Sequence, residues 1–516
     1  MERKAPVLGK EELEEFRQRT KDFYEGKITK NDYKGYSGRY GSYAQRGGKC
    51  SMIRLRMAGG RLTKDKLLYI AQSIEKYQVK KAHLTTCQTI QLHNLDADAV
   101  CGIMEGAIEH GIITLGGGGD FPRNVMAPPL SGTEKGEYFD VLPYAAKAEE
   151  FLLSFLDAKK MPRKLKVCFS SSPANVTHAT FRDLGFVARP DGKFDVYSAG
   201  GLGNQPKLGL LMAEAVDPSR ILYYILAMRE VFLEHGNYEQ RGKARTRYMR
   251  DKLGDEGYRQ AYLEKLAQAE AGEDLTIQVE PEEIAKKPDG TRVSGSRVLE
   301  QKQDGLYSVL YHPLGGCPDP AIFGRLYNVI KDMEEVELRI APDETLYIVN
   351  LRGAEAEQVL DVTQDSARTP FESSVACIGA SICQAGVRDS QSLLEEAVEA
   401  VRKADLSASA LPRVHISGCP SSCGTHQIGQ IGFRGGVKMI DKTPHPAFEV
   451  FFFGCDRQGE ERLGEAAGTM LQEDIPAFLV EVGKEAAASA LSYADWGRAN
   501  RDRLLEIPGK LTALTD

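Results

Sequence analysis

Four cysteines in the second half of the chain fall into two close pairs. Cys377 and Cys383 form a C-x5-C pair, and Cys419 and Cys423 form a C-x3-C pair. The segment between the pairs has the apolar spacing of one helix. Four thiols in two close pairs can close around one metal centre, so the sequence predicts a metal site here.

The spacings bear on the kind of metal site. Structural zinc sites use C-x2-C to C-x4-C pairs, and C-x5-C lies outside that range. The C-x2-C-x2-C run of bacterial ferredoxins is absent from the sequence. A four-iron cubane is compatible with both spacings, and cysteines without metal are the alternative. Gly418, Pro420 and Gly424 favour the cluster, because tight turns let backbone N–H groups face sulfur.

Several basic side chains stand at spacings that could bind anions. Arg54 and Arg56 alternate with apolar residues in CSMIRLRM, as in a half-buried strand. Lys164 and Lys166 are two apart, which puts both on one face of a strand, and a solvated strand edge is the alternative. A basic run further on reads as anion contacts or as an exposed helix face: Arg241, Lys243, Arg245 and Arg247.

Composition narrows the class of protein. The chain has 516 residues, enough for two to four domains, and a net charge of −7 from mixed acids and bases, which argues against nucleic-acid or membrane binding. We expect a soluble, unexported, cytoplasmic protein, because neither a long apolar run nor an apolar leader is present. Ten cysteines are too few for a disulfide scaffold, so close pairs indicate metal or redox chemistry.

The elements that must position these residues occur twice. The interval from Gly59-Gly60 to Asn94-Leu95 has the same length as that from Gly315-Gly316 to Asn350-Leu351, and each contains a helical segment and a strand. The sequence therefore predicts an internal duplication around a pseudo-twofold axis; chance recurrence of a common unit is the alternative. LTTCQTIQLHNL is expected to be one strand of the first copy. Gly/Tyr-rich residues before Cys50 are expected to lie outside the core, and Trp496 on a peripheral helix.

Motifs along nearly all of residues 50–460 resemble one family. CIGASIC followed by GCPSSCGTHQIGQIGFRG resembles the cluster signature of the sirohaem-containing sulfite and nitrite reductases, and GGRLT, LTTCQTIQLHNL, PRNV and PRKLK resemble its other blocks in the same order. The resemblance implies a duplicated α+β haemoprotein architecture, with a pseudo-twofold ferredoxin-like repeat and two larger α+β domains. The expected boundaries are an arm at 1–50, repeats at 51–125 and 301–370, a sirohaem and substrate domain with linker at 126–300, and a cluster and sirohaem domain at 371–516.

The same resemblance implies cofactors and roles. A [4Fe–4S] cluster is expected on Cys377, Cys383, Cys419 and Cys423, with Cys423 also the axial ligand of the sirohaem iron. Arg123, Lys164 and Lys166 are the expected substrate-side cations. The expected contacts of the macrocycle and its carboxylates are Arg54, Arg56, Arg434, Gly200 and Gly201. The implied activity is six-electron reduction of sulfite to sulfide or nitrite to ammonia, with electrons from ferredoxin or a flavoprotein partner.

One position departs from the family pattern. The block written here as LTTCQ normally reads TTRQ, and that arginine is an anion-binding residue of the family; this chain has Cys87. The change removes one positive charge from the expected site. His93 would share a strand face with Cys87 if the strand were regular. The alternative function is therefore a catalytically impaired sirohaem and iron–sulfur protein that binds an anion or carries electrons.

Overall fold

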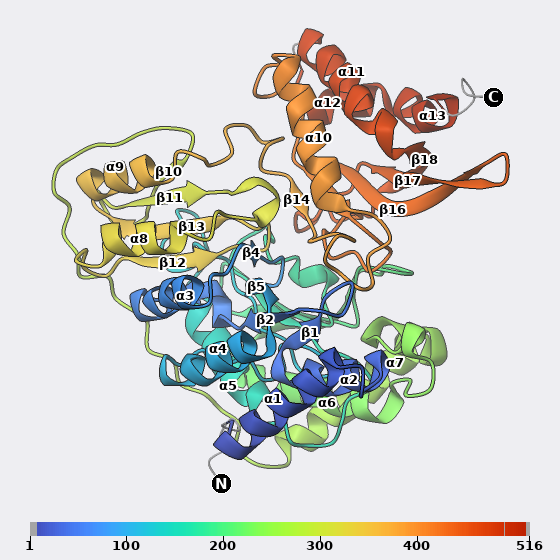
Figure 1. Ribbon diagram of the computed structural model, residues 1–516. Coiled ribbons are helices and arrows are strands. Elements are labelled where there is room, and N and C mark those ends of the chain that lie inside the picture. The colour runs from blue at the N-terminus through green and yellow to red at the C-terminus, as the bar shows by residue number, and fades with distance from the viewer. Residues whose placement is uncertain (1–7, 490, 512–516) are drawn as a thin grey trace.

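The computed structural model describes residues 8–489 and 491–511, which form four sheets with helices packed around them (Figure 1). The orange and red C-terminal unit lies above the blue and yellow sheets in that view, and green helices lie below. Within the described residues, no helix is both long enough and apolar enough to cross a membrane.

Two sheets at the centre share one hydrophobic core. The first has the order β1-β2-β5-β4 and the second the order β10-β11-β13-β12-β3. The strands of the first sheet are Ser42–Ala44 (β1), Ser51–Leu55 (β2), Ile90–Leu95 (β5) and Lys81–Leu84 (β4), with helices Lys64–Lys76 (α3) and Ala97–Glu109 (α4). Those of the second are Val298–Glu300 (β10), Tyr307–Tyr311 (β11), Leu346–Leu351 (β13), Glu337–Ile340 (β12) and Arg61–Leu62 (β3), with helices Ile322–Ile330 (α8) and Gly353–Val362 (α9).

The backbone repeats in fine detail between the two copies. Asn94 and Asn350 end equivalent strands with φ of 62° and 63°. Each asparagine hydrogen-bonds a glutamine of its own copy: the Asn94 N–H donates to Gln45 Oε1 and the Asn350 N–H to Gln301 Oε1, both at 2.7 Å. Such shared left-handed positions and partners are what duplication produces and chance recurrence does not.

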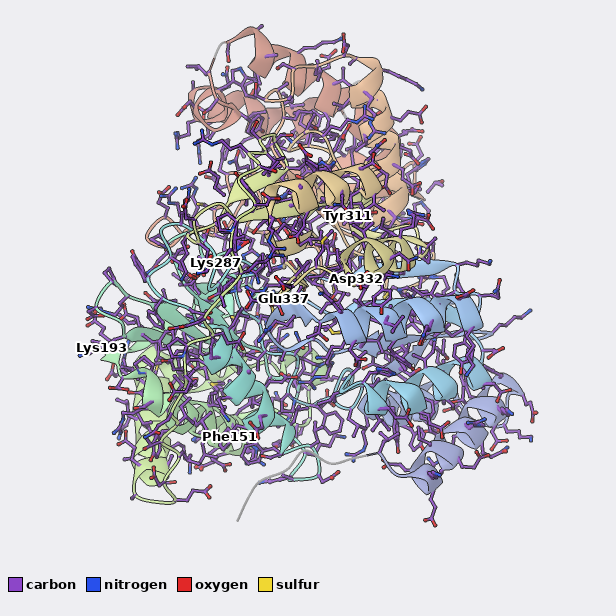
Figure 2. The ribbon with its side chains drawn as sticks, turned by 90° about the vertical axis from the view of Figure 1, so that its left-hand side faces the viewer. Phe151, Lys193, Lys287, Tyr311, Asp332 and Glu337 are labelled. Carbon is purple, nitrogen blue, oxygen red and sulfur yellow. The ribbon has the colours of Figure 1, made fainter. Side chains whose placement is uncertain are left out.

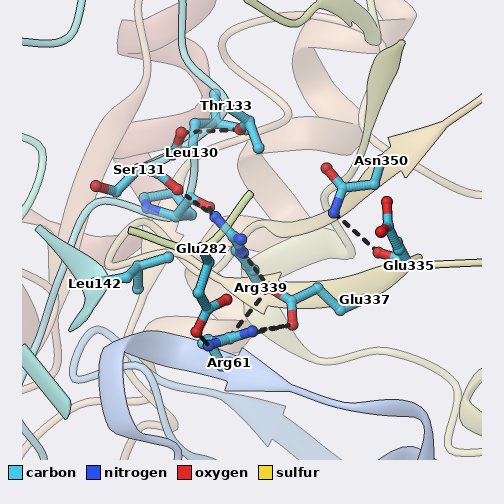
Figure 3. A network of polar contacts seen from close by, with 12 residues as sticks. Arg61, Leu130, Ser131, Thr133, Leu142, Glu282, Glu335, Glu337, Arg339 and Asn350 are labelled. Carbon is cyan, nitrogen blue, oxygen red and sulfur yellow. Dashed lines mark hydrogen bonds and ion pairs between the residues drawn. The ribbon is translucent and has the colours of Figure 1, made fainter. Parts of the chain in front are cut away.

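A strand of the first copy that pairs in the sheet of the second, together with a set of ion pairs, connects the two copies. Strand β3 comes from the first copy but pairs with β12 of the second, Leu62 opposite Leu338. Arg61 hydrogen-bonds Glu337 at 3.0 Å, Glu337 also pairs with Arg339 at 2.7 Å, and Arg61 reaches Glu282 of the segment between the copies at 2.7 Å (Figure 3). The two halves therefore meet over a partly buried polar network as well as an apolar core.

Each copy is followed by a larger α+β unit with its own core. The first has the sheet β6-β7-β8-β9, made of Val167–Ser170, Leu184–Ala188, Phe194–Ser198 and Leu210–Val216, with helices Leu142–Leu153 (α5), Ile221–His235 (α6) and Met249–Glu270 (α7). The second has the sheet β14-β15-β16-β17-β18, made of Val375–Ala376, Val414–Ser417, Ile431–Ile440, Thr443–Phe452 and Glu465–Leu471. Its helices are Ser390–Lys403 (α10), Ile475–Ala488 (α11), Tyr493–Ala499 (α12) and Arg501–Leu511 (α13). Figure 2 shows Phe151 in the first unit and Tyr311 in the second central sheet, both buried.

Several local predictions are wrong. LTTCQTIQLHNL is not one strand: Leu84 ends β4, a turn spans Thr85–Thr89, and β5 follows, because Gln88 takes a left-handed φ of 56° that breaks the strand. The Gly/Tyr-rich residues 34–49, which follow helix Lys10–Tyr24 (α1), include the end of helix Lys30–Ser37 (α2) and bury Tyr40. Trp496 is only 5% exposed and belongs to the core of the C-terminal unit.

Candidate cofactor and anion site

The two cysteine pairs lie on neighbouring loops because of the sheet that carries them. Cys377 directly follows β14, and Cys419 and Cys423 follow β15. These strands are parallel neighbours, with Val375 opposite His415, so their carboxyl ends open at the same edge of the sheet. Within the first loop, the Cys383 N–H donates to the Gly379 carbonyl at 2.8 Å and closes a tight turn.

The sulfur of Cys377 receives two polar contacts. The Gly418 N–H donates to Cys377 Sγ at 3.2 Å, and the Ser390 hydroxyl lies 3.1 Å from the same sulfur. Burial, and then the charge of Cys423, raises the pKa of Cys377 to about 12. A thiolate here therefore needs a neighbouring cation, which is what a bound metal centre provides.

The thiols of the two cysteine loops lie near one another. Burial raises the pKa of Cys423, and Cys419 and Cys383 raise it further, so these thiols lie within electrostatic range of one another. No three His, Cys, Asp or Glu side chains of residues 8–489 and 491–511 are placed to hold one metal ion. Zinc needs four ligands about 2.3 Å from one point, whereas the corners of a cubane are spread apart.

A group of cations faces the second cysteine loop. The turn with Cys87 docks there, since Thr86 Oγ1 donates to the Cys423 carbonyl at 2.8 Å. Lys166 lies beside the Cys87 thiol and interacts with it electrostatically. Burial alone raises the pKa of Cys87, but Lys166 and Arg182 outweigh it and lower that pKa to about 6. At neutral pH the Cys87 side chain is therefore mostly a thiolate among cations.

Lys164 and Arg123 complete this group. Burial lowers the pKa of Lys164 well below its usual value, and Lys166 and Arg245 lower it further. Cys423 acts in the opposite direction on Lys164, because an ionised thiol favours the charged ammonium, so this lysine lies within electrostatic range of both Cys423 and the other cations. Burial lowers the pKa of Arg123 to about 10. The Arg123 guanidinium donates to the Gly119 carbonyl at 2.8 Å, which fixes its orientation.

Buried guanidinium nitrogens without a hydrogen-bond partner mark the surroundings of the group. They are Arg123 Nε, Arg182 Nη2, Arg245 Nε and Arg247 Nη1. Unpaired buried donors are costly, so an anionic group that accepts from them would be strongly held. Arg247 lies in a short 3-10 turn and is buried, and Arg245 just before it is half-buried, so the exposed face considered for this run holds only for Arg241 and Lys243.

The glycine stretch predicted to approach the macrocycle lies against the second cysteine loop. The Gly203 N–H donates to Gln427 Oε1 at 3.0 Å, and Gln427 Nε2 donates back to the Gly203 carbonyl at 2.7 Å. A Cβ on Gly201 would lie 3.1 Å from Arg247 Nη1, and one on Gly200 would lie 2.8 Å from the Gly209 nitrogen. Contact of Gly200 and Gly201 with a cofactor stays a prediction.

The three arginines predicted to contact the cofactor differ in their surroundings. The prediction that Arg56 contacts the cofactor is wrong. Its side chain is 1% exposed, forms an ion pair with Glu149 at 2.8 Å and also donates to two carbonyls, so it cannot bind a cofactor carboxylate. Arg54 lies beside Arg123 and donates to the Gly117 carbonyl. Arg434 pairs with Glu449 and lies over the Phe451 ring. For Arg54 and Arg434 cofactor binding stays a prediction.

Three residues of the site were not predicted from the sequence. Arg182 is 6% exposed and lies beside Cys87. The Tyr43 hydroxyl accepts from the Gly119 N–H at 2.5 Å and lies beside Arg123. Arg46 donates to the Gly386 carbonyl at 2.7 Å and so reaches the first cysteine loop from the N-terminal segment. Only the position of Tyr43 and Arg46 in the run SYAQRGGK, next to a predicted strand, could have pointed to them.

The two larger units are related in the same way as the central copies. Ala127 and Ala376 donate their N–H groups to Gln88 and Glu344 at 3.0 and 3.1 Å. The next residue is Pro128 in the first unit and Cys377 in the second. Further on, Asn175 and Ser422 share left-handed φ angles of 48° and 54°, and they are followed by Val176 and Cys423. The first unit therefore has no sulfur at these two positions, and the cysteines belong to the second.

Known proteins match this arrangement. The family described as "Nitrite/Sulfite reductase ferredoxin-like half domain" matches residues 43–110, and "Nitrite and sulphite reductase 4Fe-4S domain" matches residues 118–270. The second match falls on the unit without the cysteines, as expected for a duplicated domain in which one copy has lost, or never had, these ligands.

Relatives and a solved structure extend the match to most of the chain. A chloroplastic ferredoxin–nitrite reductase of Betula pendula is 28% identical over 447 residues, 82% of this chain and 74% of the relative. A ferredoxin-dependent sulfite reductase of Mycolicibacterium paratuberculosis is 24% identical over 434 residues, 81% of this chain and 75% of the relative. The structure of the Mycobacterium tuberculosis NirA protein superposes with a TM-score of 0.75 at 22% identity, over 95% of this chain and 96% of that one, and shows the same fold.

These matches confirm the predicted fold class, a duplicated α+β architecture with ferredoxin-like halves. They also agree with the predicted cofactors, since the matched domain is named for its [4Fe–4S] cluster and the relatives are the sirohaem reductases that the motifs resemble. Residues 43–110 and 118–270 thus match nitrite and sulfite reductase domains, and most of the chain is similar to reductases of that family.

Proposed function

We propose that this protein reduces a small oxyanion by six electrons, sulfite to sulfide or nitrite to ammonia. In this proposal Cys377, Cys383, Cys419 and Cys423 hold a [4Fe–4S] cluster, and Cys423 also ligates the iron of sirohaem. The observation that carries it is that Lys164 lies within electrostatic range of Cys423 as well as of Arg123 and Lys166. Cation group and cysteine group thus converge on one place.

The residues around that place fit the cofactor. Sirohaem carries eight carboxylates, and four buried guanidinium nitrogens lack partners there. Arginine is the side chain best suited to bind carboxylates with paired donors. The bound cofactors supply an iron that takes the anion and a source of single electrons.

The chain's own residues bind the anion and move protons. Arg123 is held by backbone carbonyls, so its guanidinium is oriented before the anion arrives. Lys164 has a pKa lowered by burial, so its ammonium gives up a proton more readily than an exposed lysine does. Reduction of nitrite or sulfite consumes protons as N–O or S–O bonds break, and Lys164 is placed to supply them.

The electron donor and the anion are finer questions. The relatives named above take electrons from ferredoxin by their names, which supports ferredoxin as the donor here; a flavoprotein partner is the alternative. Those names include both a nitrite and a sulfite reductase, so both anions are proposed substrates. A cytoplasmic location stays a prediction.

The experiment measures cofactors and turnover separately. Purified protein should contain about four cluster irons and four acid-labile sulfides, plus sirohaem absorption, and should oxidise reduced viologen with nitrite or sulfite. Cys419→Ser should lose cluster iron, whereas Cys455→Ser, at a half-buried cysteine outside the group, should keep it. Lys164→Met should keep both cofactors and lose most turnover. Iron retained in Cys419→Ser would contradict the ligand assignment.

Cys87 favours a second candidate function. A thiolate beside Lys166 offsets part of the positive charge, which weakens anion binding. A protein that binds the anion or carries electrons without turnover would show both cofactors but no dye oxidation with either anion. Dye oxidation with either one rules this candidate out.

A further inference from the structure

The turn with Cys87 has a counterpart in the second copy. Gln88 and Glu344 occupy the same place in the two turns, since both have left-handed φ angles, 56° and 68°, and both accept a backbone N–H from the following unit. The residues immediately before them are Cys87 and Asp343. The pseudo-twofold axis therefore relates the Cys87 thiol to the Asp343 carboxyl.

Lys166 also has a counterpart. Strands β6 and β15 both start a parallel pair, with Val167 opposite Leu184 in the first unit and Val414 opposite Ile431 in the second. The residues just before these strands are Lys166 and Arg413. The pseudo-twofold axis that relates Cys87 to Asp343 thus also relates Lys166 to Arg413.

In the second copy these two positions form an ion pair. Arg413 Nη1 pairs with Asp343, whose carboxyl accepts also from the Thr345 N–H at 3.2 Å. Burial alone raises the pKa of Asp343, but Arg413 and His312 lower it to about 2, so the carboxylate is charged throughout the neutral range. In the first copy Lys166 lies beside Cys87, whose side chain packs against the small cluster that contains Cys168 of β6.

We propose that Cys87 is the anionic partner of Lys166, the counterpart of Asp343 with Arg413, and that this pair positions Lys166 and withdraws its charge from the substrate. The proposal rests on the proposed function and sharpens it, because the oxyanion then meets Arg123 and Lys164 as its free cations. Cys87 is thus an affinity-setting residue and not a vacant position.

The charges around Cys87 support this assignment. The groups that act on its thiol are Lys166, Arg182 and Lys164, and all are cations. Arg182 is 6% exposed, and its Nη2 has no partner, so a buried donor lies beside the thiol in addition to Lys166. Arg123 also interacts with Cys87. These cations favour the thiolate, which agrees with the pKa of about 6.

The first test compares three replacements of Cys87 in the cofactor-loaded protein. Cys87→Asp keeps an anion for Lys166 and should leave KM for nitrite or sulfite within about threefold of wild type. Cys87→Ser is neutral and frees Lys166, so KM should fall by about tenfold, the worth of one charge-assisted hydrogen bond. Cys87→Arg should lower KM further. Equal KM values for Cys87→Asp and Cys87→Ser would overturn the proposal.

The second test measures the reactivity of the Cys87 thiol and does not depend on turnover. Iodoacetamide labelling at pH 7, followed peptide by peptide, should modify Cys87 faster than Cys50, which is half-buried and whose pKa is raised by burial. Lys166→Met should slow labelling of Cys87 about tenfold or more, because the protonated thiol is not nucleophilic. Lys207→Met, at an ion pair with Asp251, is the control and should change nothing.

The two tests fail for different reasons. Labelling of Cys87 that is unchanged by Lys166→Met overturns the ion pair, whatever the activity. Protein that lacks iron and turnover but shows the lysine-dependent labelling contradicts the proposed function and leaves the pair standing. No labelling of Cys87, together with equal KM values for the serine and aspartate variants, overturns the pair as well.

Discussion

Acid should unfold this protein at a mildly acidic pH, because several buried histidines are kept neutral. Burial, and then Arg413, lowers the pKa of His312 to about 4 and that of His415 to about 4. Burial, and then Arg434, lowers the pKa of His426 to about 3. Both ring nitrogens of His426 are buried without a partner, and so is Nε2 of His312, so neither imidazolium would be solvated.

The direction of the pH dependence follows from the difference in proton binding between the folded and unfolded states. A histidine in the unfolded chain has a pKa of about 6.5, above the folded values, so between about pH 6.5 and pH 4 the unfolded chain binds more protons. The stabilisation is complete above about pH 6.5 and is lost as the pH falls. Each histidine contributes about 1.4 kcal/mol per pH unit in this window, so three lower the free energy of unfolding by about 8 kcal/mol from pH 6.5 to 4.5. Typical unfolding free energies are about 5–15 kcal/mol.

The assay is urea unfolding, followed by circular dichroism, at half-unit steps from pH 7.5 to 4.5. His312→Asn keeps a polar group near Thr345, which His312 Nδ1 contacts at 2.9 Å, and should reduce the slope of stability against pH by about a third. His110→Asn, at an exposed contact with Asp65, is the control and should leave the slope unchanged. Stability that stays constant from pH 7 to 5, or an unaltered slope in His312→Asn, would refute the reasoning.

Three further perturbations test other parts of the structure. Glu149→Ala leaves the buried Arg56 unpaired and should lower the free energy of unfolding by about 3–5 kcal/mol, measured by urea titration, while Glu149→Gln should cost less. Gly60→Ala should reduce soluble yield and stability, because φ is +76° and its Cβ would lie 2.3 Å from a backbone carbonyl of β12; Gly136→Ala, with φ of +87° but open space, isolates the strain from the clash. Arg46→Ala removes the contact with the Cys383 loop, so iron loss to a chelator should speed up about tenfold, with Arg457→Ala as an exposed control.

The predictions that succeeded rest on short-range order in the chain. The duplication was visible because equal intervals separate glycine pairs from Asn-Leu pairs, and the left-handed angles at those positions explain why these residue types recur. Family motifs assign Arg123, Lys164 and Lys166 to the substrate side; Lys164 does lie within electrostatic range of the other two, and their role stays a prediction. Spacing within a loop or strand is inherited directly from the sequence, so inferences of this kind carry over to the fold.

The failures share one cause. Side-chain periodicity predicts which face of a strand a residue lies on, but not which residue of another element contacts it. Alternation put Arg56 on a strand face, and only the fold brings Glu149 of α5 to its guanidinium. Arg182 carried no signal, because its importance comes from lying beside Cys87. The parity argument for His93 and Cys87 failed at Gln88, where a left-handed residue turns a predicted strand into two.

In our proposal the two copies of this chain have diverged into complementary halves of one site. The second unit carries Cys377 and Cys423 where the first has Pro128 and Val176, so in our proposal only the second can ligate a cluster. The first contributes Lys164 and Arg123 to the same place. The copy-to-copy comparison also reinterprets the one departure from the family pattern: judged against the usual arginine, Cys87 is a lost cation, but judged against Asp343 it is an anion with its own cationic partner. These two interpretations predict opposite effects of Cys87→Asp on anion affinity, since a carboxylate worsens a cation deficit but preserves an ion pair.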